Sequence, residues 1–198
     1  MARSVDYYFA PQSPWTYLGH ERFVRLVREH GAQVRVRPVD LGRVFAVSGG
    51  WPLALLLALR PRYRLVELAR FARHLDLPLH PQPQFFPVAG DPAARLIVAV
   101  EQSHGTDAAL RISGAVFAAV WAQQRNIADE AVLAELLVEQ GLPASCVQAA
   151  HTPEVQQRYE AHTQAAIDAG VFGAPSYVID GEIFWGQDRL DFVARALA

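Results

Sequence analysis

The spacing of apolar residues in the first 40 positions changes from that of a strand to that of a helix and back. Residues 4–9 are rich in β-branched and aromatic side chains, which predicts a strand. Ser13-Pro14 offers the hydroxyl N-cap and first-turn proline of a helix start, and apolar residues recur at helical spacing until Gly31. Residues 33–37 alternate and predict a second strand. Strand, helix and strand form a βαβ unit, whose strands should be parallel with a right-handed crossover.

From about residue 41 to residue 169 the chain shows no convincing strand pattern. Alanine- and leucine-rich stretches at helical spacing are separated by prolines and glycines. They predict helices at 63–75, 92–104, 108–124, 130–140 and 153–169. We therefore expect the middle of the chain to be helical.

The strand pattern returns near the C-terminus. Residues 176–180 and 182–185 predict two strands that are joined by a hairpin turn at Asp180-Gly181. Asp188 is predicted to cap a last helix, whose apolar positions follow at helical spacing.

The order of these elements is β-α-β, a long helical segment, then β-β-α. This order is that of an α/β protein with a thioredoxin-like fold, in which both halves contribute to one four-stranded mixed sheet. We expect a discontinuous thioredoxin-like domain at 1–40 and 171–198, and a large all-helical insertion at 41–170.

Composition excludes several classes of protein. The 198 residues are 52% hydrophobic with a formal net charge of −2, which argues against a disordered chain and against a nucleic-acid partner. The longest apolar run, residues 53–59, is far shorter than the roughly 20 residues that span a bilayer. The N-terminus lacks the pattern of a signal peptide, so we expect no membrane partner and a cytoplasmic location.

The absence of certain side chains limits the possible chemistry further. The sequence contains no lysine, which excludes a lysine Schiff base and a lysine-bearing phosphate loop. Its single cysteine, Cys146, cannot form an intrachain disulfide, a Cys-x-x-Cys pair or a multi-thiolate metal site. The seven histidines show no metal-ligand spacing, and we predict no metal site.

Three short segments could carry chemistry. Ser13 follows a strand at a helix N-terminus, where a thioredoxin plan normally has its redox cysteine; it could hydrogen-bond a thiolate or act only as an N-cap. Ala174-Pro175 precedes a returning strand, where a cis peptide could expose backbone to a ligand or proline could simply begin the strand. Gln187 and Asp188 could hold an amino group or only begin a helix.

Taken together, these segments resemble a known family. The chain from Tyr7 to Leu18 resembles the opening of the 2-hydroxychromene-2-carboxylate isomerase family, which is related to kappa-class glutathione transferases and DsbA-like oxidoreductases. The family's C-terminal signature resembles residues 170–178 and 184–190, and residues 63–70 and 86–90 are similar as well. The resemblance covers nearly the whole chain.

The resemblance implies glutathione as cofactor and assigns Ser13 as the catalytic residue that hydrogen-bonds its sulfur. It implies that the backbone of Ala174, beside a cis Pro175, pairs with the cysteinyl group of glutathione. It further implies that Gln187 and Asp188 hold the γ-glutamyl end.

Two assignments in the first half of the chain are less direct. Arg60 falls near a basic residue that contacts the glycyl carboxylate in the family. The family often has an asparagine after a Ser-Gly pair, whereas this chain reads Ser48-Gly49-Gly50, so the corresponding contact to glutathione is missing from the pattern.

The function implied is that of a glutathione-dependent isomerase. It would interconvert 2-hydroxychromene-2-carboxylate and trans-o-hydroxybenzylidenepyruvate in aromatic-compound catabolism, with a small aromatic carboxylate as substrate and a homodimeric assembly. The alternatives are a kappa-like glutathione transferase or peroxidase acting on other electrophiles, and a non-catalytic thioredoxin-fold binding protein. A disulfide oxidoreductase is disfavoured because the chain has no Cys-x-x-Cys pair.

Overall fold

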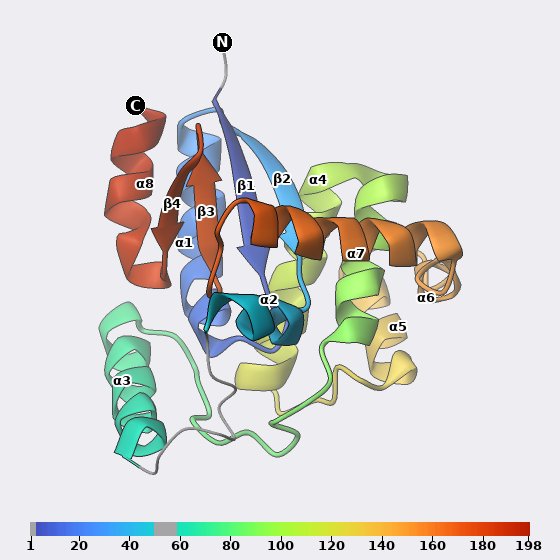
Figure 1. Ribbon diagram of the computed structural model, residues 1–198. Coiled ribbons are helices and arrows are strands. Elements are labelled where there is room, and N and C mark those ends of the chain that lie inside the picture. Colours follow the sequence, from blue (N-terminus) through green and yellow to red (C-terminus); the bar gives the residue numbers. More distant parts are fainter. Residues whose placement is uncertain (1–2, 50–58) are drawn as a thin grey trace.

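The computed structural model describes residues 3–49 and 59–198, with the side chains of 59–61 outside that description (Figure 1). The elements follow one another along the chain as β1 (Ser4–Phe9), α1 (Pro14–Glu29), β2 (Gln33–Pro38), α2 (Leu41–Ser48), α3 (Leu59–Leu75), α4 (Asp91–Trp121), α5 (Glu130–Glu139), α6 (Cys146–Ala149), α7 (Pro153–Asp168), β3 (Ser176–Ile179), β4 (Glu182–Trp185), the 3-10 helix η2 (Gln187–Arg189) and α8 (Leu190–Leu197).

The strands form one mixed sheet in the order β2-β1-β3-β4. β1 runs parallel to β2 and antiparallel to β3, and β3 runs antiparallel to β4. Tyr7 is the residue of β1 that pairs with Val36 on one side and Tyr177 on the other. The βαβ unit, the hairpin and the four-stranded thioredoxin-like sheet predicted from the sequence are confirmed.

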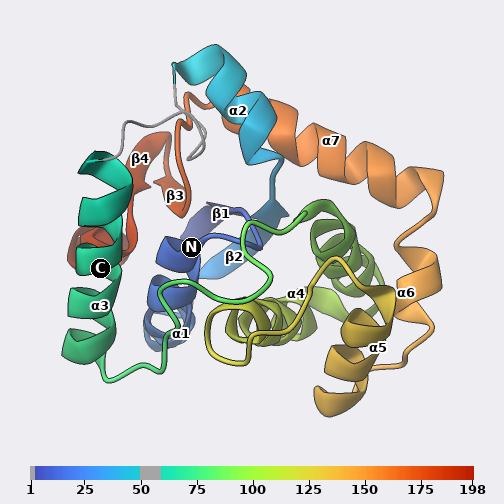
Figure 2. The same cartoon turned by 90° about the horizontal axis from the view of Figure 1, so that it is seen from below.

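Helices cover both faces of the sheet (Figure 2). Val5, Tyr7 and Phe9 of β1 point into a core that they share with α1, α4 and α8. Tyr8 and Val178 lie on the opposite face, in a smaller core with residues of α2 and α7. Alternate residues of β1 therefore serve two different cores, which is why this strand is buried almost throughout.

The long helix α4 is buried on nearly every side because it packs against the sheet, α1, α5 and α7. Gly105 interrupts it with φ of 82° and ψ of 177°, values outside the helical region. The sequence predicted two helices separated at this glycine, and the structure has that break inside one element. The proposed division into 1–40 with 171–198 and an insertion at 41–170 stays a prediction, although α4 and α1 share one core.

Two features differ from the sequence prediction. The sequence did not predict α2, which has only eight residues and begins where the carboxylate of Asp40 accepts a hydrogen bond from the Gly42 N–H at 2.9 Å. Asp188 was predicted to cap the last helix, and this prediction was wrong. The chain first forms η2, α8 begins after Arg189 without a side-chain cap, and the Asp188 carboxylate pairs with Arg189 at 2.7 Å.

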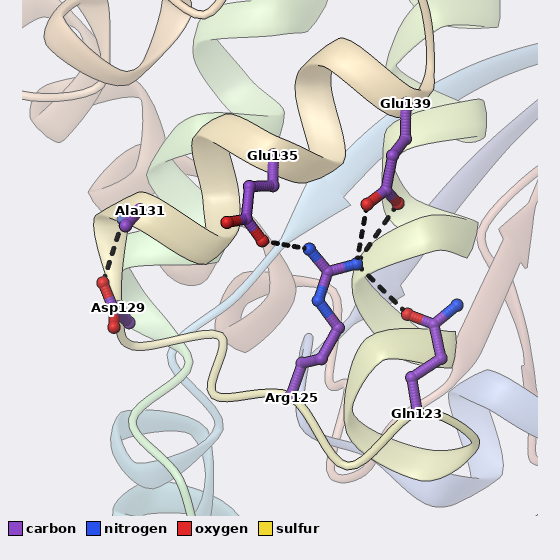
Figure 3. Close-up of polar contacts among 6 residues, drawn as sticks. All are labelled: Gln123, Arg125, Asp129, Ala131, Glu135 and Glu139. Carbon is purple, nitrogen blue, oxygen red and sulfur yellow. Dashed lines mark hydrogen bonds and ion pairs between the residues drawn. The ribbon is translucent and has the colours of Figure 1, made fainter.

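A guanidinium ties the segment between α4 and α5 to α5 itself (Figure 3). Arg125 donates hydrogen bonds to Glu135 at 2.8 Å and to Glu139 at 3.0 Å, both on α5. Asp129 caps the same helix by accepting from the Ala131 N–H at 2.9 Å. The short α5 is thus fixed at its start and along its exposed face. None of the helices in the described ranges is long and apolar enough to cross a membrane.

Two histidines are buried in the folded chain. The ring of His20 contacts the Leu110 carbonyl through Nε2 at 2.9 Å and the Tyr7 hydroxyl through Nδ1 at 3.2 Å. Because the carbonyl can only accept, Nε2 carries the proton and Nδ1 accepts from Tyr7. Burial lowers the pKa of His20 to about 4. Burial, with Arg37 and Arg158 nearby, lowers the pKa of His162 to about 4 as well.

We predict that the free energy of unfolding falls as the pH is lowered from about 6.5 toward 4. An unfolded histidine takes up its proton near pH 6.5, whereas His20 and His162 stay neutral in the native state until about pH 4. In that window the unfolded state binds more protons, and each histidine contributes roughly 1.4 kcal/mol per pH unit. Denaturant titrations at several pH values between 5 and 6.5 measure this slope.

His20→Gln should lower this slope by roughly 1.4 kcal/mol per pH unit, which is the contribution of one proton, because glutamine does not titrate. His162→Gln should lower the slope to a similar extent, because burial lowers the pKa of His162 to about 4 as well. A slope that is equal in His20→Gln and in the unchanged protein would contradict the assignment.

Candidate functional site

A cavity of about 520 Å³ is lined by residues of α3 and by residues at the end of the sheet toward which β1 and β4 run. Figure 1 shows α3 near that end of the sheet. This volume is within the range of about 300–1,000 Å³ that is typical of small-molecule sites. The lining residues come from α1, α3, the segment before β3 and the β4–η2 junction. They are Trp15, Tyr63, Arg64, Glu67, Phe71, Ala174, Trp185, Gly186, Gln187, Asp188 and Arg189.

Ser13 lies beside this cavity, next to Ala174. Its Oγ accepts a hydrogen bond from the Thr16 N–H at 3.2 Å, which makes it the predicted N-cap of α1, with Pro14 in the first turn. The same hydroxyl donates to the Ala174 carbonyl at 3.4 Å, a long bond. The fold thus brings together two predicted site residues that are 161 positions apart. The helix N-terminus at Ser13 favours an anion.

The Ala174-Pro175 peptide bond is cis, as the sequence resemblance implied. Ala174 lines the cavity, and the Pro175 carbonyl accepts a hydrogen bond from the Gly186 N–H at 2.9 Å. This bond joins the start of β3 to the end of β4, so the residues before and after the hairpin form one wall.

Gln187 is buried and is held by two contacts with α1. Arg22 of α1 donates hydrogen bonds to its side-chain oxygen and, at 3.1 Å, to its backbone carbonyl. A Cβ at Gly19 would lie 2.8 Å from the Gln187 Cβ, so α1 packs closely against η2 at this glycine. The sequence does not predict this role for Arg22, because nothing in local spacing indicates a contact between residues 165 positions apart. Burial lowers the pKa of this guanidinium.

Asp188 differs from Gln187 in being exposed. Its carboxylate pairs with Arg189, and a Cβ at Gly186 would lie 2.6 Å from its Oδ1. Gly186 also has φ of 106° and ψ of 150°, a conformation that side chains rarely adopt. Because Gly186 has no Cβ, the Asp188 carboxylate can lie against it at the cavity.

The helix α3 supplies the opposite wall. Arg64, Glu67 and Phe71 lie on one side of it at helical spacing, and Arg60 is one turn earlier. The side chain of Arg60 lies outside the described residues, so its contact to a glycyl carboxylate stays a prediction. Residues 50–58, which include Gly50 at the position of the family's asparagine, lie outside the description as well.

Aromatic rings form much of the cavity surface. Trp15 and Phe71 meet edge to face with ring centroids 6.0 Å apart, and Phe172 meets Trp185 in the same manner at 4.9 Å. A Cβ at Gly173 would overlap the Trp185 indole nitrogen, so the indole rests on the backbone there. Such walls suit a flat, apolar ligand.

The cavity has no thiol of its own. The single cysteine, Cys146, is buried in the main core at the start of α6 and does not line the cavity. Within 3–49 and 59–198, no three histidine, cysteine, aspartate or glutamate side chains gather in a way that could hold a metal ion.

Comparison with known proteins agrees with this geometry. The chain matches the DSBA-like thioredoxin domain over residues 4–198. It is 30% identical to a 2-hydroxychromene-2-carboxylate isomerase from Pseudomonas putida over 98% of this chain and 93% of the relative. It is 28% identical to glutathione S-transferase kappa 1 from Caenorhabditis elegans over 98% of this chain and 90% of that protein. A solved structure of a 2-hydroxychromene-2-carboxylate isomerase superposes with a TM-score of 0.82 at 28% identity, over 98% and 94% of the two chains.

The chain belongs to the DsbA-like thioredoxin family. Within that family it is similar to the 2-hydroxychromene-2-carboxylate isomerases and the kappa-class glutathione transferases along nearly its whole length. As a DsbA-like protein without a Cys-x-x-Cys pair, it has Ser13 at the N-terminus of α1 and cannot exchange disulfides there. The family resemblance inferred from the sequence is confirmed.

We predict that Gly186→Ala weakens binding of glutathione, the ligand that the resemblance implies, by about tenfold or more. The new Cβ would displace the Asp188 carboxylate, and losing one charge-assisted hydrogen bond costs about 1.5–3 kcal/mol. Isothermal titration calorimetry measures the affinity. Gly181→Ala is the control, because Gly181 also has a positive φ, 85°, but a Cβ there would meet nothing within 4 Å. Equal affinities in the two variants would contradict a role for Asp188.

Proposed function

We propose that this protein is a glutathione-dependent isomerase that interconverts 2-hydroxychromene-2-carboxylate and trans-o-hydroxybenzylidenepyruvate. The observation that carries the proposal is the position of Ser13, at a helix N-terminus beside a cavity that contains no thiol. The similarity to proteins that carry this name, at 28–30% identity over nearly the full length, supports it.

The residues around the cavity suit glutathione, which bears a thiol, an ammonium group and two carboxylates. The carboxylate of Asp188 would hold the ammonium group, and the amide N–H groups of Gln187 would face the carboxylate of the same γ-glutamyl end. The backbone of Ala174 would pair with the cysteinyl group, and Arg60 would contact the glycyl carboxylate. These assignments place the sulfur near Ser13, at the positive end of the α1 dipole.

The Ser13 hydroxyl can donate a hydrogen bond to a bound thiolate. Its O–H donates only weakly to the Ala174 carbonyl, at 3.4 Å, and a nearby thiolate would be the stronger acceptor. The Thr16 N–H, at 3.2 Å from Oγ, holds the hydroxyl in place from the helix side. Both the hydroxyl and the helix N-terminus stabilise the charged form of a thiol and lower its pKa.

When bound, glutathione would supply a thiolate that can add reversibly to a conjugated carbon and so allow the neighbouring bond to rotate. Such a cycle has no net redox change and needs no second cysteine. The chain's own part is to orient the thiol at Ser13 and to surround the reacting carbon with the rings of Trp15, Phe71 and Trp185. These rings would also exclude water from the open intermediate.

We predict that Ser13→Ala lowers kcat/KM for 2-hydroxychromene-2-carboxylate at saturating glutathione by roughly 100-fold or more. The lost hydroxyl would raise the pKa of the bound thiol, and removal of one stabilising donor typically costs about that factor. The ultraviolet difference spectrum of bound glutathione, followed against pH, measures the thiol pKa directly.

Thr152→Ala is a matched control for this experiment. Thr152 caps α7 by accepting from the Val155 N–H, and Pro153 follows it as Pro14 follows Ser13. Both variants should lose about 1 kcal/mol of stability as caps, but only Ser13→Ala should lose activity. Turnover of a generic electrophile without turnover of the chromene substrate would instead identify a kappa-like transferase, and no glutathione binding at all would indicate a non-catalytic binding protein.

We also propose that the protein acts as a homodimer in the cytoplasm, within the degradation of aromatic compounds. The resemblance to the isomerase family motivates this expectation. Light scattering after size-exclusion chromatography should give twice the chain mass of 21.9 kDa, and a mass of one chain would contradict the dimer.

A further inference from the structure

Arg64 is unusual among the charged residues that line the cavity. The cavity has two guanidiniums, Arg64 and Arg189, and two carboxylates, Glu67 and Asp188. Arg189 pairs with Asp188, and Glu67 pairs with Arg70 on the adjacent turn of α3. Among the residues that the structure describes, Arg64 alone of these four has no oppositely charged partner.

Aromatic rings hold this guanidinium in place. Its central carbon lies 5.2 Å from the ring centroid of Phe86 and 5.6 Å from that of Trp121. The two rings also contact each other, with centroids 4.9 Å apart. Cation–π contact engages the face of a guanidinium and leaves the N–H groups at its edge available to an acceptor.

The half-buried, unpaired charge of Arg64 favours the binding of an anionic ligand beside it. Arg64 is half-buried, and this burial lowers the pKa of its guanidinium. An unpaired charge that is removed from water is unfavourable, and a ligand carboxylate accepting two parallel N–H bonds would compensate it. The Trp15 and Phe71 rings line the same cavity, and they suit a planar aromatic group.

We propose that Arg64 binds the carboxylate of the second substrate and makes the cavity selective for flat aromatic acids over neutral electrophiles of the same shape. This inference rests on the proposed function, because it places the second substrate beside glutathione in the same cavity. It assigns the carboxylate of the substrate to Arg64 and leaves the two ends of glutathione to Gln187 with Asp188 and to Arg60.

Two conjugated ketones of nearly equal shape test the proposal. Benzylidenepyruvate carries a carboxylate where benzylideneacetone carries a methyl group. Both are titrated calorimetrically into the protein saturated with S-methylglutathione, which has no free thiol to react, and again without it. The unchanged protein should bind benzylidenepyruvate more tightly by roughly 10- to 100-fold, as one charge-assisted bidentate contact provides.

Arg64→Met should abolish that preference while changing the affinity for benzylideneacetone and for S-methylglutathione by no more than about twofold. Arg64→Lys keeps the charge without the planar fork and should retain part of the preference. Arg73→Met removes an exposed arginine on the opposite side of α3 and should change nothing. Thermal unfolding of each variant checks that it folds.

Three results would overturn the proposal. Equal affinity of the unchanged protein for the two ketones would show that no carboxylate is recognised, and an equal preference in Arg64→Met would show that another residue recognises it. Weaker binding of S-methylglutathione by Arg64→Met, with the ketone preference intact, would assign Arg64 to glutathione and leave the proposed function standing. Failure of the proposed function itself is distinguishable, because the unchanged protein would then not bind S-methylglutathione.

Discussion

The antiparallel pairing of β1 with β3 is the contact on which the site depends. It is centred on Tyr7 and Tyr177, which lie opposite each other and stack with ring centroids 5.4 Å apart and planes only 3° from parallel. Phe23 of α1 packs against both rings, and the Tyr7 hydroxyl donates to His20 of the same helix. These aromatic side chains are fully buried, so β1, α1 and β3 are joined through one cluster at the centre of the protein.

This cluster determines where the chemistry can occur. With β1 and β3 in this register, the end of β1 and the start of β3 meet at the same edge of the sheet. The N-terminus of α1 therefore lies beside the Ala174-Pro175 peptide, and Ser13 reaches the Ala174 carbonyl. The hairpin then returns Trp185 and Gln187 to the same edge, where Arg22 holds Gln187 against α1. The N-terminus of the α1 helix, the Ser13 hydroxyl and the backbone at Ala174 therefore meet at this edge because of the strand pairing, although they are far apart in the sequence.

The sequence predicted those parts of the molecule that depend on local pattern. The strand at 4–9, the Ser13 cap, the break at Gly105 and the Asp180-Gly181 turn all follow from spacing or from one residue's backbone preference. The prediction failed where the helical pattern was too short, and where a side chain had another interaction partner available. The eight residues of α2 are too few for a clear period, and the Asp188 carboxylate pairs with Arg189 instead of capping α8.

By itself the sequence determined the order of the four strands, the absence of a redox pair and the positions of Ser13 at the start of α1 and of Ala174 before β3. Only the tertiary structure decided which side chains meet. The contacts of Arg22 with Gln187 and of Arg64 with Phe86 and Trp121 join residues from separate segments of the chain. Hydrophobic periodicity states which face of a helix is buried, but side-chain pairing depends on how two buried faces pack, and that packing is set by the whole core at once.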